Sequence, residues 1–369
     1  MDSVLISGAS VAGPTLAYWL RRRGFAVTVV ERAPAPRPGG QAIDVRGVAL
    51  DVVDRMGILA ALRQVRTRTR GMSMLDGDGN EVMRSTEVAL SSGRLDGDDI
   101  EVLREDLTGL LHARTRDDVE YLFGDSVTEV TQQDDGVRVR FERAEPRTFD
   151  LVVGADGLHS TVRRLAFGPE ADHVTHLGTY LAIFTAENLL DLDHWQIWMR
   201  DGSAGCGIYP VRDNTELRVN LGFESAPIEY DFRDTEQQRR LVADRFGGLR
   251  WEIPRLLDAM WRAPDFYFDA MAQVRMESWT RGRVTLLGDA GYCPSPLSGQ
   301  GTSLALVGAY VLADELGSAA GDHSAALRRY ERRMRPFVLL NQALATENPG
   351  GPAAEESVDR AKRAIALDR

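Results

Sequence analysis

The 369-residue sequence contains few of the residues that build disulfide frameworks, metal sites or membrane spans. Its two cysteines, Cys206 and Cys293, fit neither a disulfide framework nor a metal-ligand spacing, so we expect two buried thiols and no metal. No apolar run approaches the roughly 20 residues that cross a bilayer. The N-terminus enters the apolar residues 4–6 at once, without a basic region and cleavage site before them. We therefore expect a cytoplasmic protein with no membrane partner.

Lysine is almost absent. Of the 44 basic residues only Lys362 is a lysine, and the other 43 are arginines scattered along the chain. The formal net charge of −11 argues against nucleic acid and anionic membranes as partners. The hydrophobic content of 43% and charged content of 27% are typical of a globular protein. A chain of this length can bury one large core or two closely packed domains.

The pattern of apolar residues predicts a parallel sheet that is interrupted in sequence. The N-terminus is typical of a βαβ unit, with a strand, a glycine-containing turn, a helix and a second strand. The strands predicted for this part of the fold cover residues 3–7, 26–30, 149–154 and 283–287, with a hairpin over 126–132 and 136–141. The predicted helices cover 13–23, 48–62, 104–115, 302–316 and 323–345, with a further helical tail after the break at 348–352.

A second sheet is predicted inside this first one. Between residues 175 and 224 four strand-like stretches follow one another, separated by Asp201-Gly202 and Asp213-Asn214, which favours an antiparallel sheet. These stretches cover 180–185, 195–199, 206–210 and 217–223, and helices at 235–246 and 253–261 follow them. The fold class is therefore α/β, a Rossmann-like domain with an inserted, mostly antiparallel sheet and C-terminal helices. We expect the Rossmann-like domain over 1–70, 98–172 and 275–320, the inserted domain over 71–97 and 173–274, and a helical segment over 321–369.

The first motif that carries chemistry is Gly8-Ala9-Ser10-Val11-Ala12-Gly13. A turn of this kind lets backbone N–H groups approach a pyrophosphate at a helix N-terminus. Glu31 follows Gly8 by 23 residues, close to the spacing of about 20 expected for a carboxylate on a ribose hydroxyl. The middle glycine of the usual fingerprint is Ser10, so the motif alone leaves open a tight turn that binds nothing.

Two further motifs place acids and glycines at strand ends. Asp150 to Gly157 ends a strand in Gly-Ala-Asp-Gly, at the sheet edge where ligands bind in open α/β folds. As an isolated stretch it equally fits a capped helix start, with Ser160 as the N-cap. Residues 282–301 end another strand in Gly-Asp-Ala and continue through a Pro- and Gly-rich loop to a helix beginning near Gly301. That helix start would face electron-rich oxygen or nitrogen atoms of a ligand.

Together these motifs resemble the FAD-binding signatures of the aromatic-hydroxylase family of flavoprotein monooxygenases, typified by para-hydroxybenzoate hydroxylase. The chain length and the Gly-Asp-Ala…Pro…Gly-Gln-Gly segment are most similar to the branch that contains the tetracycline-inactivating monooxygenases. The resemblance spans residues 4 to about 335 and implies a role in antibiotic or secondary metabolism.

The resemblance implies a set of FAD-binding residues. The pyrophosphate turn would supply Gly8, Ser10, Val11, Ala12 and Gly13, and the adenosine side would supply Glu31 and Arg32. Arg104 would lie along the FAD, Arg46 would reach the flavin side, and Asp156 and Gly157 would contact both FAD and reduced nicotinamide. Asp289 would bind the ribityl chain, and the flavin ring would run beside Pro296, Gly299, Gln300, Gly301 and Thr302. Two positions depart from the family pattern, because Tyr292 replaces a histidine and Ser303 replaces an asparagine.

The implied activity is oxygen transfer by the cofactor, with no catalytic side chain assigned. NADPH or NADH would reduce the flavin as a transient cosubstrate, and O2 would give a flavin C4a-hydroperoxide that passes one oxygen to an aromatic or polyketide-like small molecule. From strand placement we expect the substrate to touch Trp198, Tyr209, Arg218, Asn220 and Leu297. His159 and His194 are interpreted as surface or hydrogen-bonded histidines rather than as catalysts. A monomer and a homodimer both fit the sequence.

Three other functions are alternatives to a monooxygenase. A flavin-dependent halogenase would carry a lysine in its N-terminal half and a Trp-x-Trp-x-Ile-Pro motif, and neither is present because the one lysine is Lys362 and residues 195–198 read Trp-Gln-Ile-Trp. A reductase or dehydrogenase on the same flavin scaffold remains open, and oxygen uptake would separate it from a monooxygenase. A non-catalytic flavoprotein that binds a metabolite also remains open.

Overall fold

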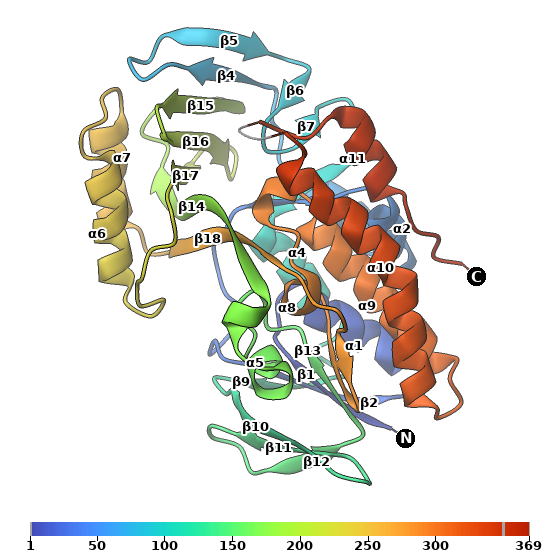
Figure 1. Cartoon of the computed structure of the whole chain (residues 1–369). Helices are drawn as coiled ribbons and strands as arrows, with labels where there is room; N and C mark the ends of the chain where they lie inside the picture. Colours follow the sequence, from blue (N-terminus) through green and yellow to red (C-terminus); the bar gives the residue numbers. More distant parts are fainter. Residues whose placement is uncertain (1, 349–350, 369) are drawn as a thin grey trace.

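The computed structural model describes residues 2–348 and 351–368 of the chain. Two sheets stand side by side, one mainly parallel and one mainly antiparallel, and helices cover their outer faces (Figure 1). The chain moves from the first sheet to the second and back twice, so each sheet is built from distant segments. The predicted α/β class with an inserted sheet is confirmed.

The six-stranded sheet has the order β19-β20-β13-β1-β2-β9. Its strands are β1 (Ser3–Ser7), β2 (Ala26–Glu31), β9 (Glu120–Phe123), β13 (Leu151–Gly154), β19 (Thr280–Arg281) and β20 (Val284–Leu286). All neighbours run parallel except β19 and β20. The central strands are continuous apolar runs because both faces of the sheet are covered.

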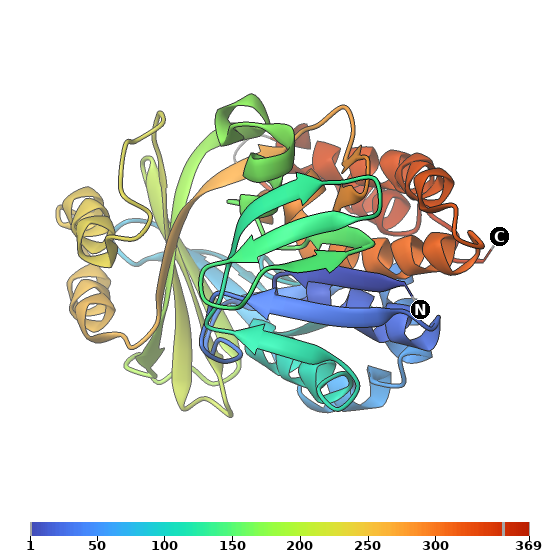
Figure 2. The ribbon, with the colours of Figure 1, turned by 90° about the horizontal axis from the view of Figure 1, so that it is seen from below.

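Helices cover one face of this sheet and a small sheet covers the other (Figure 2). The helices are α1 (Ala12–Arg22), α9 (Gly301–Gly317) and α10 (His323–Glu347). The small sheet consists of β10 (Val127–Gln132), β11 (Val137–Phe141) and β12 (Arg147–Phe149), and its apolar side chains belong to the same buried core as β1 and β13. The predicted hairpin over 126–141 is confirmed by the β10–β11 pair.

Two predicted elements of this region were wrong in extent. The helix expected over 48–62 is two helices, α2 (Val48–Arg55) and α3 (Leu59–Gln64), because Gly57 takes a left-handed φ of 71° between them. The strand expected over 149–154 breaks at Asp150, so β12 joins the small sheet and only β13 enters the parallel one. The Asp150 carboxylate accepts hydrogen bonds from the Ser3 backbone N–H and hydroxyl, at 2.7 and 2.8 Å, which fixes this break beside β1.

The seven-stranded sheet has the order β18-β14-β17-β16-β15-β4-β5. Its strands are β4 (Gly71–Leu75), β5 (Glu81–Ser85), β14 (Val174–Glu187), β15 (Trp195–Asp201), β16 (Ala204–Val211), β17 (Glu216–Glu224) and β18 (Phe266–Val274). The antiparallel sheet predicted over 175–224 is confirmed, although β14 is longer than expected and β15 pairs with β4 in parallel. The strand β18 was missed by the sequence analysis.

Helices α6 (Thr235–Phe246) and α7 (Ile253–Arg262) cover the outer face of this sheet, as Figure 2 shows. Successive side chains of β17 point to opposite faces of the sheet. Leu217, Val219 and Leu221 are fully buried in the core that these helices complete, so Arg218 and Asn220 lie on the inner face, toward the parallel sheet.

The remaining elements connect the two sheets. A short ladder pairs β3 (Ala42–Val45) with β8 (Ile100–Leu103), which leads into α4 (Arg104–Ala113), and a smaller ladder pairs β6 (Val88–Ala89) with β7 (Gly93–Arg94). Strand β13 leads into α5 (Thr161–Phe167) and a 3-10 turn η1 (Glu170–Asp172). After β20 come α8 (Asp289–Tyr292) and the 3-10 turn η2 (Pro296–Ser298), which precede α9.

The C-terminal helix α11 (Glu355–Lys362) packs on the body of the molecule. Asn341 of α10 donates to the Ala361 carbonyl at 3.1 Å, and the Lys362 ammonium lies 2.9 Å from the Asp99 carboxylate. Part of the predicted break at 348–352, residues 349 and 350, lies outside the described residues. Within residues 2–348 and 351–368 none of the helices combines the length and the hydrophobicity that crossing a bilayer requires.

Candidate cofactor site

Three turns meet at the carboxyl edge of the parallel sheet. A Cβ atom placed on Gly8, after β1, would lie 2.3 Å from the Ala155 carbonyl oxygen after β13. One placed on Gly288, after β20, would lie 3.4 Å from Cβ of Ala12 at the start of α1. The first, second and third sequence motifs are therefore in direct contact, although more than 100 residues separate each from the next.

The first turn requires glycine at both ends. Gly8 has a φ of 111°, which side chains rarely adopt, and a Cβ on Gly13 would lie 1.9 Å from the Gly8 carbonyl oxygen. Residues Val11 and Ala12 are buried at the start of α1, while Ser10 stays half-buried at the mouth of the turn. The start of α1 therefore leaves its first backbone N–H groups directed at the turn, where an anion is stabilised.

A small cavity lies beside this turn and contains the predicted adenosine side. Glu31 ends β2, and its carboxylate accepts from the backbone N–H groups of Ala9 and Ala33, each at 2.9 Å. Arg104 begins α4, and the Arg104 guanidinium donates to the Gly39 carbonyl at 2.8 Å. The cavity is lined by Ala9, Ser10, Glu31, Ala35, Pro36, Arg37, Arg104 and Thr108. Glu31, Ser10 and Arg104 are thus brought together, whereas Arg32 is exposed and does not line the cavity.

The Asp156 carboxylate of the second motif accepts hydrogen bonds from residues at the start of α5. It accepts from the Ser160 hydroxyl at 2.5 Å and from the Val162 N–H at 3.1 Å, while Ser160 itself caps the helix by accepting from Arg163 N–H at 2.9 Å. Burial raises the pKa of Asp156, and these hydrogen bonds oppose that shift. The Ser160 N-cap is confirmed. Gly157, with a φ of 83° and open space beside it, leaves the turn accessible.

The third motif forms a tight loop before α9. Gly299 takes a left-handed φ of 63°, and a Cβ there would lie 3.5 Å from the Arg46 guanidinium. Gln300 is fully buried, and within the described chain its amide oxygen and nitrogen have no hydrogen-bond partner. A Cβ on Gly301 would lie 3.7 Å from the Asp289 carboxylate, and Thr302 is half-buried beside it. Arg46, Asp289 and the loop before α9 are therefore neighbours, with Pro296 and Leu297 exposed at the rim.

The two departures from the family pattern have structural roles. The Ser303 hydroxyl accepts from the Arg46 backbone N–H at 3.0 Å and so fixes the end of β3 to α9. The Tyr292 hydroxyl is buried and lies 2.9 Å from the Tyr330 hydroxyl of α10, which also donates to the Leu286 carbonyl. Tyr292 therefore holds the segment between β20 and α9 against α10, whereas Ser303 ties α9 to the residue that follows β3.

A buried pair of carboxyl groups beside Arg46 was missed by the sequence analysis. The β3–β8 ladder places Asp44 opposite Glu101, and both are less than a tenth exposed. Burial raises the pKa of Asp44 to about 7, against the opposing effect of the Arg46 guanidinium 2.8 Å away, and burial also raises the pKa of Glu101. The signal in the sequence was an acid flanked by apolar residues in each of two short strands, AIDV and IEVL.

The five predicted substrate residues divide into two groups. Trp198 and Asn220 lie in register on the inner face of the seven-stranded sheet: Trp198 lies over Gly207, and Asn220 donates to the Gly207 carbonyl at 3.2 Å. Leu297 is 45% exposed in the loop before α9. Tyr209 and Arg218 are buried and bind the β2–β3 loop and the start of β3 instead. Their partners are the Gly40 carbonyl of the loop and the backbone N–H of Ala42, the first residue of β3.

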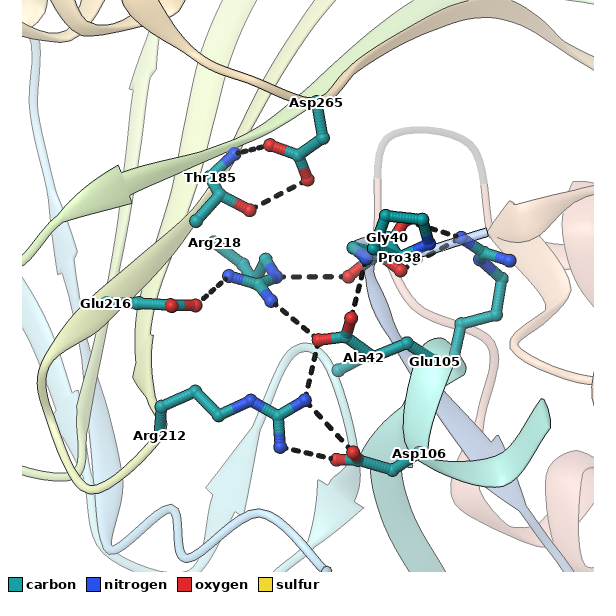
Figure 3. A network of polar contacts seen from close by, with 12 residues as sticks. Pro38, Gly40, Ala42, Glu105, Asp106, Thr185, Arg212, Glu216, Arg218 and Asp265 are labelled. Atoms are coloured by element: carbon teal, nitrogen blue, oxygen red, sulfur yellow. Dashed lines mark hydrogen bonds and ion pairs between the residues drawn. The ribbon is translucent and has the colours of Figure 1, made fainter. Parts of the chain in front are cut away.

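Figure 3 shows the network around Arg218. Glu105 of α4 lies at its centre, accepting from Arg218 at 3.2 Å, from Arg212 at 2.6 Å and from the Gly39 N–H at 2.6 Å. Arg212 also pairs with Asp106 at 2.9 Å. The network thus joins the seven-stranded sheet, α4 and the β2–β3 loop.

A second polar cluster joins the turn before α5 and the 3-10 turn η1 to β18. His159 lies 2.9 Å from both the Glu170 and the Asp269 carboxylates, and these bonds raise the pKa of His159 to about 10. His159 is therefore a hydrogen-bonded histidine, as expected, and His194 lies 3.8 Å from Asp193. Tyr267, which is 46% exposed and donates to Asp269 at 3.1 Å, was missed because its strand was missed. Both cysteines are buried free thiols, as expected.

Comparison with known protein families identifies one match over most of the chain. A family model described as "FAD binding domain" matches residues 1–343. The chain is 52% identical over 369 residues to the uncharacterized protein Rv1260 of Mycobacterium tuberculosis, covering 100% of this chain and 99% of that protein. It is 41% identical over 339 residues to a flavin-dependent monooxygenase of Legionella longbeachae, covering 92% of this chain and 86% of that protein.

Comparison with solved structures agrees with the sequence matches. The crystal structure of the tetracycline destructase Tet(55) superposes with a TM-score of 0.88 at 37% sequence identity, covering 100% of this chain and 99% of that one. The similarity therefore extends over both sheets and the C-terminal helices.

Proposed function

The chain belongs to the FAD binding domain family and is an FAD-dependent monooxygenase, and on that premise we propose that it uses NADPH or NADH and O2 to insert one oxygen atom into an aromatic or polyketide-like small molecule. The observation that carries the proposal is the contact of three distant turns at one edge of the parallel sheet. That edge is where open α/β folds bind dinucleotides.

The residues present fit FAD. The Gly8–Gly13 turn has no room for a side chain at either glycine and presents the N-terminus of α1, as a pyrophosphate requires. Glu31 and Arg104 line the cavity beside the turn, where the adenosine ribose would lie. At the other end, Asp289 and the loop Pro296–Gly301 would hold the ribityl chain and the flavin ring. The unpartnered amide of Gln300 gives this loop an unused donor and an unused acceptor for a polar ring edge.

The chain's own part in the reaction is to bind the flavin and the substrate, to orient them, and to exclude water from them. When bound, the flavin supplies the redox and oxygen-transfer chemistry. The start of α9 at Gly301 stabilises negative charge beside the ring through its free N–H groups. Arg46 is held by Asp44 and by Ser303, so its cationic group stays in place beside Gly299. We include Asp156 and Gly157 in the proposal as the turn that a reduced nicotinamide would approach.

The substrate would lie on the inner face of the seven-stranded sheet. Tyr267, Asn220 and Trp198 lie in register on this face, and the Tyr267 ring is exposed. Leu297, exposed in the loop before α9, would complete the site. Flat apolar side chains with a few polar groups suit a planar, oxygen-rich ring system. The similarity to a tetracycline destructase favours a fused-ring polyketide over a simple phenol.

The test is oxygen incorporation. The purified protein should carry FAD, and tetracyclines, aromatic polyketides and simple phenols should be screened for faster NADPH or NADH oxidation. With 18O2 we expect one labelled atom in the product by mass spectrometry. NADPH consumption that yields a reduced product without label would identify a reductase instead. A protein that remains colourless after reconstitution with FAD would refute the proposal.

A further inference from the structure

The inner face of the seven-stranded sheet holds the β2–β3 loop through two neighbouring side chains. Tyr209 of β16 and Arg218 of β17 are directly opposite each other in the sheet. The Tyr209 hydroxyl accepts from the Ala42 N–H at 3.0 Å, and the Arg218 Nε donates to the Gly40 carbonyl at 3.1 Å. Both side chains are at most 3% exposed. The Tyr209 hydroxyl and the Arg218 Nε are therefore used on this segment rather than on the space between the sheets.

All three nitrogens of the Arg218 guanidinium take part in this arrangement. Each of its three guanidinium nitrogens donates one hydrogen bond: Nε to Gly40, one terminal nitrogen to Glu216 at 2.9 Å, and the other to Glu105 at 3.2 Å. Figure 3 shows these three partners around the guanidinium. A buried arginine with balanced partners is costly to leave unpaired, so its geometry is strongly determined.

Glu105 connects Arg218 to the backbone of the β2–β3 loop. Its second oxygen accepts from the Gly39 N–H at 2.6 Å, while the preceding residue, Arg104, donates to the Gly39 carbonyl at 2.8 Å. Gly39 has a φ of 69°, and a Cβ on it would lie 2.4 Å from the carboxylate of Asp265, the residue before β18. The loop is therefore clamped on both sides and cannot shift without breaking several of these contacts.

The opposite side of the same loop faces the candidate cofactor. Residues Ala35, Pro36 and Arg37 line the cavity that also contains Glu31 and Arg104. One short segment, residues 35–42, thus lies between the dinucleotide turn and the substrate sheet. A displacement of the loop would move both Arg104 and the wall of this cavity.

We propose that Arg218 is a positioning residue for FAD. Through Glu105 and the β2–β3 loop it keeps Arg104 and the cavity wall on the adenosine side of the cofactor site in position. The proposal rests on the proposed FAD binding. It assigns Arg218 a role on the cofactor side, in place of the substrate contact expected from the sequence, and it assigns Tyr209 a weaker role of the same kind. The substrate sheet then contributes to cofactor affinity although its strands lie outside the dinucleotide turn.

The experiment compares FAD dissociation constants of the apoproteins, measured by quenching of flavin fluorescence in the absence of any substrate. Arg218→Gln should bind FAD at least about tenfold more weakly than the wild type. The substitution removes the buried charged hydrogen bond to Glu105 and leaves the Glu105 carboxylate without this cation. Arg218→Lys should fall between the two, since it keeps a charge beside Glu105. Arg212→Gln, which removes the more exposed arm of the same network, should stay within about threefold.

Two outcomes would overturn the inference. A dissociation constant of Arg218→Gln within twofold of the wild-type value would do so, because a substrate ligand or a purely structural residue leaves FAD affinity unchanged once the protein is folded. If Arg218→Gln does not fold, Glu105→Gln and Tyr209→Phe take its place, and equal FAD affinity in both would equally refute it. A wild-type protein that binds no FAD would instead refute the proposed function.

Discussion

Replacing Asp44 by asparagine should make the protein more stable at alkaline pH. Asp44 lies in a buried strand opposite Glu101, and its pKa is raised from 3.8 to about 7, chiefly by burial. Because the folded state binds this proton more tightly than the unfolded state, stability falls as the pH rises from about 4 to about 7. Above that range the carboxylate is ionised in both states and the loss is complete.

The magnitude follows from the size of the shift. About three pKa units at 1.36 kcal/mol each give an upper limit of about 4 kcal/mol of stability lost between pH 4 and pH 8. Asparagine keeps an oxygen for the Arg46 guanidinium, now 2.8 Å from the carboxylate, but removes the charge that neutralises it. The net gain of Asp44→Asn at pH 8 should therefore be smaller, about 1–3 kcal/mol.

The assay is thermal and urea unfolding of the apoprotein at pH 5, 6, 7 and 8, for the wild type, Asp44→Asn and the exposed control Asp54→Asn. The stability difference between Asp44→Asn and the wild type should grow in favour of the variant up to about pH 7 and then level off, while Asp54→Asn follows the wild type. A variant whose pH dependence parallels that of the wild type would show that Asp44 does not hold its proton. A variant that is less stable than the wild type at pH 8 would show that the Arg46 pairing outweighs burial.

Three further substitutions test the site and the fold. Gly13→Ala should abolish FAD retention, because its Cβ would lie 1.9 Å from the Gly8 carbonyl oxygen; flavin absorbance per mole of purified protein measures this, and normal loading would contradict the packing argument. Gly57→Ala should cost about 1 kcal/mol in urea unfolding, since its φ of 71° is strained for alanine; an unchanged midpoint would show that the α2–α3 connection relaxes freely. Tyr292→Phe should cost about 1 kcal/mol through loss of the hydroxyl pair with Tyr330, and an equally stable variant would mean that the pair contributes nothing.

The sequence predicted the local elements of the cofactor side well, because their signals are local. A glycine turn between two apolar strands indicates a βαβ unit by itself, and β1, α1 and β2 lie within one or two residues of their expected bounds. Similarly, alternation of apolar residues predicted β15, β16 and β17 and the helices that cover them. The Gly57 break escaped notice because the apolar period continues through it, and only the left-handed backbone reveals the end of α2.

The contacts between distant segments could not be predicted in the same way. The pairing of Asp44 with Glu101 depends on the register of β3 and β8, which 54 residues of intervening chain do not encode locally. Arg218 was expected to contact the substrate from its placement in the strand predicted over 217–223. Its position between the buried Leu217 and Val219 does put it on the inner face of the sheet. The sequence does not show that the β2–β3 loop packs against this position and accepts a hydrogen bond from the Arg218 guanidinium.

The threading of the chain between its two sheets sets a schedule for biosynthesis. Strand β20 stands next to β13 in the parallel sheet, and the loop before α9 comes later still, so the third wall of the cofactor site is made of residues near 284–301. At roughly 5–20 residues per second a ribosome needs about 15–60 s to reach this point. Until then the nascent polypeptide exposes an unfinished sheet edge and half a binding site, so the cofactor site cannot be complete before residues 284–301 have been made.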